Sequence, residues 1–138
     1  MTTTSTDHSD AVGACRALVL GYHRDIDSGH ATAGINAFAE NAEFAARGQV
    51  MRGRGEILGF LTQREQQTDR HTVHVIANEI VVASGDDHVE MDAFVLLHVR
   101  QAGGGYHLDR VLDTRHAFRR DGGTWLITRR TSVSLHAA

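Results

Sequence analysis

Proline and lysine are absent from the 138 residues of this sequence, and cysteine occurs once, as Cys15. A single cysteine excludes a disulfide within the chain and a zinc site built on several cysteines. Because all fourteen cationic side chains are arginine, Schiff-base and lysine-nucleophile chemistry is excluded as well. No apolar run approaches the roughly 20 residues that a membrane-spanning helix needs.

The charge balance and the N-terminal residues narrow the class of protein further. A formal net charge of −3 with histidine neutral argues against a nucleic-acid-binding domain, which usually carries a basic excess. The first residues show no basic start followed by an apolar stretch, so a secretory signal is not expected. We therefore expect a cytoplasmic protein that binds neither nucleic acid nor membranes.

The length and composition suit one globular domain. Hydrophobic residues make up 41% of the chain and charged residues 22%, which is enough apolar material for one core. Residues 1–9 are small and polar and are expected to form a disordered tail. The domain is therefore predicted to span residues 10–138.

The first half of the domain carries helical periodicity. Apolar residues recur at helical spacing from residue 10 onward, and a Ser-Gly pair directly after Asp27 is a stop signal. In the last helix of this half, Ile57, Leu58 and Leu61 are expected to face inward. The predicted elements are helices over residues 10–27, 32–39 and 55–66 and short strands over residues 43–46 and 49–52.

The second half of the domain is typical of long antiparallel strands. Residues rich in Val, Ile, Leu and Thr alternate with short Gly- and Asp-containing turns. Helices followed by a strand meander predict an α+β fold, with three helices on one face of a curved antiparallel sheet. The predicted strands cover residues 72–83, 88–101, 106–119 and 124–135.

One predicted strand, over residues 88–101, shows two distinct faces. Its odd-numbered positions from Val89 to Val99 are all apolar, so this row is expected to pack on the helices. The even-numbered row mixes polar and apolar side chains, which is what a lined cavity needs, with Phe94, Leu96 and His98 deepest. An ordinary solvated face is the alternative interpretation of the same row.

Asp27 and His74 are the two residues whose placement needs explanation. Asp27 lies in the last turn of the first helix, at the negative end of the helix dipole, where a nearby histidine would compensate the carboxylate. His74 lies in an otherwise apolar strand, and a partner carboxylate would change its pKa. The alternatives are a solvated aspartate and a core histidine bound to a backbone carbonyl. His71 points to the opposite face from His74, so no metal pair is expected.

Other sites are weaker or absent. Arg110 and Arg115 can bind a substrate carboxylate, although surface ion pairs are the alternative interpretation. The three consecutive glycines at 103–105 join two strands and do not open a helix, so they form a turn and no phosphate loop. Serine and cysteine nucleophile motifs are also absent.

Several local strings resemble the SnoaL-like group of the nuclear-transport-factor-2-like superfamily over residues 10–134. The first helix ends in YHRDIDSG (residues 22–29), similar to the Tyr…Asp-x-Gly helix end of that group. GRGEILGFL (53–61) resembles its G-x-x-x-I-x-x-F-L helix, and FRRDGGTW (118–125) resembles its penultimate hairpin. The resemblance implies a cone-shaped α+β barrel, as in ketosteroid isomerase and the cystatin-like fold. It also implies self-association, and hence a homo-oligomer.

Within this group, the dehydratases give the best match. Bile-acid 7α-dehydratase, scytalone dehydratase and hexachlorocyclohexane dehydrochlorinase share a helix-end aspartate and a strand histidine at a spacing close to that of Asp27 and His74. By the same resemblance Tyr22 and His98 are further catalytic candidates. Phe94, Leu96 and Thr114 are the expected substrate-binding residues.

The residues and the resemblance together predict a cofactor-independent dehydratase without a metal, acting on a small hydrophobic substrate such as a polyketide or steroid. Asp27 would orient His74, and His74 would remove a proton beside a carbonyl. A polyketide cyclase or isomerase is one alternative, with Asp92 or Asp113 as the working aspartate. The other is a non-catalytic assembly module similar to a ring-hydroxylating dioxygenase β subunit, which predicts a filled cone and no contact between Asp27 and His74.

Overall fold

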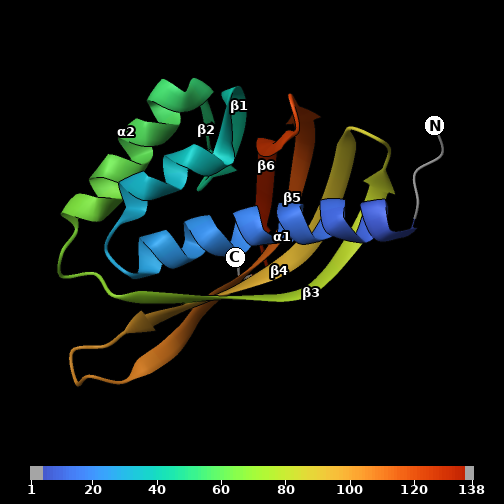
Figure 1. The fold of residues 1–138 in the computed structure, drawn as a ribbon. Coiled ribbons are helices and arrows are strands. Elements are labelled where there is room, and N and C mark those ends of the chain that lie inside the picture. The colour runs from blue at the N-terminus through green and yellow to red at the C-terminus, as the bar shows by residue number, and fades with distance from the viewer. Residues whose placement is uncertain (1–4, 136–138) are drawn as a thin grey trace.

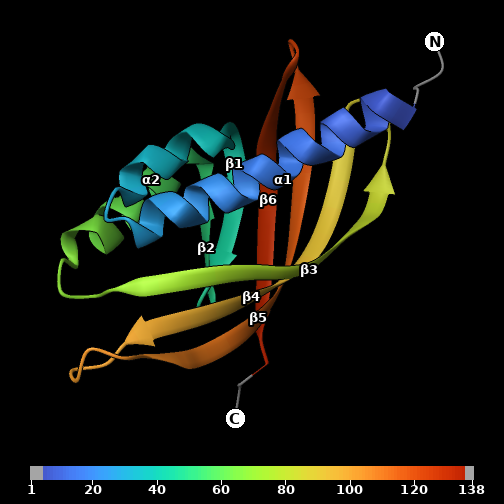
Figure 2. The same cartoon turned by 60° about the horizontal axis from the view of Figure 1, so that its bottom comes forward.

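A computed structural model describes residues 5–135 of the chain, and it has the predicted α+β architecture. Two α-helices and one 3-10 helix lie on one face of a six-stranded sheet (Figures 1 and 2). None of the helices in this part of the chain is long and apolar enough to cross a membrane. The elements are α1 (Ser5–Asp27), η1 (Ala31–Ala37), β1 (Phe38–Ala46), β2 (Gln49–Arg52), α2 (Gly53–Gln66), β3 (Thr72–Ser84), β4 (His88–Arg100), β5 (Tyr106–Asp121) and β6 (Thr124–Ser134).

The strands are arranged in the order β2-β1-β6-β5-β4-β3. All neighbouring strands are antiparallel except β1 and β6, which run parallel. Strands β3 to β6 therefore form the meander that the turns in the sequence predicted. The sheet curls so strongly that β3 runs beneath α1, while β1 and β2 stand beside η1 and α2 (Figure 2).

Helix α1 crosses the sheet diagonally and supplies one side of the core (Figure 2). The predicted apolar arc is confirmed, because Cys15, Val19, Tyr22 and Ile26 are all buried. Burial of this arc is the main force that fixes the helix on the sheet. Helix η1 packs closely on it, since a side chain at Gly34 would come within 3.1 Å of the Tyr22 Cβ.

Two expectations for the helices are corrected by the structure. Helix α1 begins at Ser5, so the tail expected over residues 1–9 is helical from that residue, and residues 1–4 lie outside the described part. On α2, Ile57 and Leu61 are fully buried, but Leu58 is 40% exposed. Phe60 packs against the core in its place, so the stripe of α2 that touches the core is rotated toward Phe60.

A bulge in β3 changes which residues of that strand face the helices. Thr72, His74 and Ile76 alternate regularly on the face toward the helices, but the register with β4 shifts after Ala77. Asn78 takes a left-handed conformation at φ 56 at this point, which inserts an extra residue and reverses the alternation beyond it. Strict alternation would place Ile80 on the same face as His74, but after the bulge Ile80 is 62% exposed.

The two leucines of α2 give a test of this packing. Leu61→Ala should lower the free energy of unfolding by about 2–5 kcal/mol, because it leaves a cavity in a filled core. Leu58→Ala, at an exposed position of the same helix, should cost less than about 1 kcal/mol. Urea unfolding of the two variants measures the difference, and equal losses would contradict the orientation of α2.

Candidate functional site

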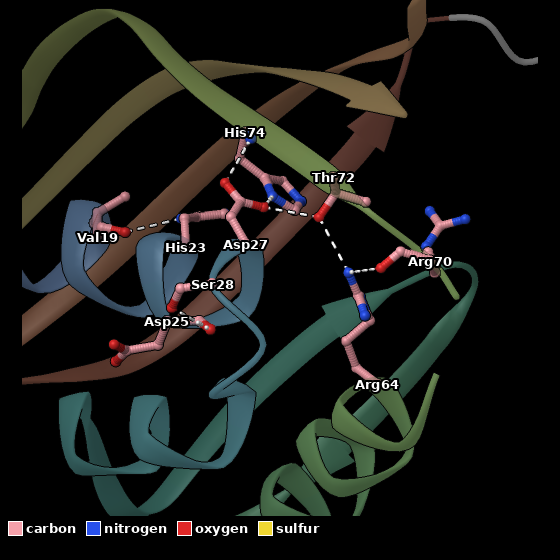
Figure 3. Close-up of polar contacts among 9 residues, drawn as sticks. All are labelled: Val19, His23, Asp25, Asp27, Ser28, Arg64, Arg70, Thr72 and His74. Atoms are coloured by element: carbon pink, nitrogen blue, oxygen red, sulfur yellow. Dashed lines mark hydrogen bonds and ion pairs between the residues drawn. The ribbon is translucent and has the colours of Figure 1, made fainter. Parts of the chain in front are cut away.

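The Asp27 carboxylate, at the last residue of α1, accepts hydrogen bonds from three donors of β3 (Figure 3). The Nδ1–H of His74 donates to Oδ1 at 2.6 Å, and the His74 backbone N–H donates to Oδ2 at 2.8 Å. The Thr72 hydroxyl donates to Oδ1 at 2.8 Å. The contact expected between Asp27 and His74 is present, although the two residues are 47 positions apart along the chain.

The surrounding elements hold this contact in place. Helix α1 stops at Asp27 because Gly29 adopts φ +86 and the Ser28 N–H still bonds to the Arg24 carbonyl at 3.0 Å. From α2, the Arg64 guanidinium donates to the Thr72 hydroxyl at 3.2 Å, and the same nitrogen donates to a nearby backbone carbonyl (Figure 3). A chain of donors thus runs from α2 through Thr72 to the carboxylate.

Two opposing effects act on the pKa of Asp27. Burial raises it, but the hydrogen bonds from the side chain and backbone of His74, and from Thr72, together lower it by more. The carboxyl pKa therefore lies below its ordinary value, and the group stays ionised at neutral pH. An ionised acceptor at Nδ1 fixes the neutral imidazole of His74 with its proton on Nδ1 and leaves Nε2 as a bare acceptor.

His74 lies at the wall of a cavity of about 200 Å3 between the helices and the sheet. Leu97 pairs directly with His74 on the neighbouring strand and lines the same cavity. Asp27 holds the imidazole from behind and is not one of the lining residues. The cavity is lined by Tyr22, His23, Ile26, Phe44, Ala46, Arg47, Gly48, Phe60, His74, Leu97, Arg110, Leu112, Arg130, Ser132 and Ser134.

A second polar cluster lies deeper in the same region. The Tyr22 hydroxyl and His116 Nε2 are 2.7 Å apart, and both side chains are fully buried. Burial raises the pKa of Tyr22 to about 12 and lowers the pKa of His116 well below its ordinary range. Burial also lowers the pKa of His23, whose Nδ1–H donates to the Val19 carbonyl at 2.8 Å. The cluster is therefore neutral at physiological pH.

A match to one protein family extends over nearly all of the described residues. The SnoaL-like domain family matches residues 7–131. The chain belongs to this family. No curated protein matches the sequence.

Solved structures similar to this SnoaL-like domain show the same fold at low sequence identity. An NTF2-like protein with a cystatin-like fold from Novosphingobium aromaticivorans is 21% identical, with a TM-score of 0.80 over 100% of this chain and 94% of that one. The protein Aln2 from a Streptomyces species is 16% identical, with a TM-score of 0.79 over 91% of each chain. A protein from Catenulispora acidiphila in complex with S-DNPA is 16% identical, with a TM-score of 0.78 over 91% of this chain and 94% of that one.

Three residues that were expected to line the cavity lie on the opposite face of the sheet, away from the helices. His98 pairs with Val73, and Leu96 pairs with Val75, and both of these valines are 42% exposed. Because paired residues share a face, Leu96 and His98 point away from the cavity, as does Phe94 in the same row. The apolar row does pack toward the helices as predicted, but the cavity opens on that face too. The cavity forms on this face because the helices cover the sheet only in part.

Thr114 and the alternative aspartates also lie away from the cavity. Thr114 is buried, but its hydroxyl donates to the Ala93 carbonyl at 2.8 Å and it is not a lining residue. Asp92 forms two hydrogen bonds with Arg115, at 2.6 and 3.0 Å. Asp113 is exposed. In residues 5–135, no group of three or more His, Cys, Asp and Glu side chains is placed to hold a metal.

Arg130 is one of the lining residues that the sequence did not predict. An ordinary alternation along β6 would place it opposite to the buried Ile127. The register between β5 and β6 instead skips Thr128, so that Ile127 pairs with Phe118 and Arg129 pairs with Ala117. This bulge turns Arg130 inward, where it is only 4% exposed. Nothing in the residue pattern marks such a one-residue insertion.

The depressed pKa of Asp27 makes its contribution to stability depend on pH. A carboxyl whose pKa is lowered by folding stabilises the native state above its unfolded pKa of about 3.9, and that stabilisation is lost as pH falls through the lower folded value. Asp27→Asn should therefore cost about 1–3 kcal/mol at pH 7 and progressively less below about pH 4. Urea unfolding from pH 7 to pH 2 measures this, with Asp25→Asn as the control. If the difference in unfolding free energy between the wild type and Asp27→Asn does not change with pH, the lowered pKa of Asp27 is contradicted.

Proposed function

We propose that this SnoaL-like domain is a cofactor-independent dehydratase for a small, largely apolar β-hydroxy carbonyl compound with a polyketide- or steroid-like skeleton. The observation that carries the proposal is the 2.6 Å contact between Asp27 and His74, with the imidazole at the wall of a cavity. This combination supplies an oriented base at the wall of a cavity that is open to a ligand. A protein of the same fold in complex with S-DNPA supports a ligand site in such a domain.

The proposed reaction begins with proton removal at the carbon beside the substrate carbonyl. The Nε2 lone pair of His74 takes this proton, and the electrons of the broken C–H bond form an enolate. The enolate electrons then form a carbon–carbon double bond as the neighbouring C–OH bond breaks. The leaving hydroxide takes a proton and departs as water, so that no oxidant or reductant is consumed. Asp27 is a positioning residue that stabilises the imidazolium while it exists.

The proton for the leaving group is assigned to His74 itself. Once His74 has accepted a proton, it holds that proton at the cavity wall, whereas Asp27 is ionised and burial raises the pKa of Tyr22 to about 12. The Tyr22 hydroxyl is also engaged by His116 at 2.7 Å, so we assign Tyr22 to shaping the cavity wall. His98 faces away from the cavity and takes no part in the step.

The alternatives have less support. A cyclase or isomerase with an aspartate base needs Asp92 or Asp113 at the cavity, but Asp92 is bound to Arg115 and neither aspartate lines it. An assembly module with a filled cone has neither an open cavity of about 200 Å3 nor a paired Asp27 and His74. The expectation of a homo-oligomer stays a prediction.

Turnover of a bicyclic β-hydroxyketone gives the direct test. The probe 3-hydroxy-1-tetralone loses water to give 1-naphthol, which is followed by its fluorescence. His74→Gln and Asp27→Asn should each lower kcat by about 10²–10⁴-fold, the size of a lost general base or its orientation. His98→Gln, on the outer face, should retain the wild-type rate within about twofold. Unchanged rates in His74→Gln would reject the proposed base.

Hydrogen exchange separates proton removal from elimination. The parent ketone 1-tetralone has no leaving group, but its C2 proton is still exposed to a base. Wild-type protein should accelerate deuterium exchange at C2 in D2O, and His74→Gln should not. Exchange by the wild type without any elimination from the hydroxylated probe would favour an isomerase or cyclase.

The role assigned to Tyr22 is tested by removing only its hydroxyl. If His74 carries both protons, Tyr22→Phe should lower kcat by less than about tenfold, because only packing and one hydrogen bond change. The same naphthol assay measures it. A loss as large as that of His74→Gln would instead identify Tyr22 as the acid.

A further inference from the structure

Arg130 places a positive charge inside the cavity wall. Its side chain is 4% exposed, and one terminal nitrogen, Nη1, donates to the Ala45 carbonyl at 2.9 Å and to the Ser132 hydroxyl at 3.4 Å. Its guanidinium carbon lies 4.6 Å from the centre of the Phe44 ring. The Nε atom is buried without any hydrogen-bond partner among the described residues. Arg130 also interacts with the Tyr22 hydroxyl. All of these acceptors are neutral, so together with one aromatic face they compensate only part of the charge.

A counter-charge for Arg130 is missing from the described part of the chain. No ion pair joins Arg130 to a carboxylate there, and neither Asp nor Glu is found in the cavity lining. The ionised carboxylate behind the cavity wall, Asp27, is already bound by His74 and Thr72. Buried charges are normally paired, because desolvation without a partner is costly.

Two further arginines line the same cavity nearer to solvent. Arg47 occupies the β1–β2 turn in a left-handed conformation at φ 54, an uncommon one for a residue other than glycine. Arg110 comes from β5, and its Nε lies 3.2 Å from Asp109. The buried imidazoles His23 and His116 are neutral, so the guanidinium groups dominate the potential in this cavity.

We infer that the cavity binds an anionic ligand, an apolar skeleton bearing a carboxylate that is held by Arg130. The inference deepens the proposed function and rests on it for calling this ligand a substrate. The substrate class is then a hydroxy carbonyl compound with a carboxylate at a position remote from the reacting carbons. Arg47 and Arg110 attract the anion from solvent, and the aromatic rings of Phe44 and Phe60 pack against its skeleton.

A carboxylate fits this site better than a neutral polar group for a physical reason. A planar carboxylate accepts two parallel hydrogen bonds from a guanidinium, and both partners are ionised, which makes the bonds strong. Because Arg130 is almost fully buried, the same pair also supplies its missing counter-charge in a medium that screens charge weakly. An amide of equal size offers one acceptor and brings two donors toward a cation.

The experiment compares two ligands that differ only in this group. Binding of 2-naphthoate and of 2-naphthamide to the full chain is measured by calorimetry at pH 7. The wild type should prefer the carboxylate by about ten- to a hundredfold. Arg130→Met, which keeps an unbranched side chain and removes its charge, should reduce the preference below about threefold. Arg119→Met, at an exposed arginine on β5, is the control and should keep it.

Each outcome decides the inference. Equal affinities in the wild type, no binding of either ligand, or an unchanged preference in Arg130→Met would overturn it. The wild-type comparison needs no variant, so it remains decisive if Arg130→Met does not fold. If the wild type prefers the carboxylate but forms no naphthol, only the proposed dehydratase activity is contradicted. If it forms naphthol but does not prefer the carboxylate, only the inference of an anionic ligand is contradicted.

Discussion

The site depends on one carboxylate placed where a helix by itself disfavours it. Asp27 ends α1 at the negative end of the helix dipole, and three hydrogen bonds from β3 more than offset that cost. The contact therefore joins the helical layer to the sheet and at the same time fixes the tautomer of His74. Stability and chemistry share one interaction here, so a change at Asp27 affects both.

Most of the architecture could be predicted from the sequence because it rests on strong local signals, whereas the contact between Asp27 and His74 was expected only once the family resemblance was added to the residue pattern. The helix stop after Asp27, the apolar arc of α1 and the Gly-containing turns each specify a boundary without help from distant residues. The orientation of a residue could not be predicted where it depends on a single inserted residue. The bulge at Asn78 moved Ile80 outward, and the bulge at Thr128 moved Arg130 inward. An alternating pattern carries no mark of such an insertion.

The misplacement of His98 has a different cause. Its row on β4 looked suited to a cavity because it mixes polar and apolar residues, yet the cavity lies on the purely apolar face. The helices cover that face only in part, and the uncovered area near His74 and Leu97 remains open. Where a cavity forms is decided by the fit of separate elements, which a single strand does not encode.

The central claim is that Asp27 holds His74 with its proton on Nδ1 and its bare Nε2 toward the cavity. Nitrogen NMR of the histidine side chains, at a pH where the His74 ring is neutral, tests this most directly. We expect a protonated Nδ1 and an unprotonated Nε2 for His74, with the difference lost in Asp27→Asn. A neutral ring that carries its proton on Nε2 in the wild type would contradict the account.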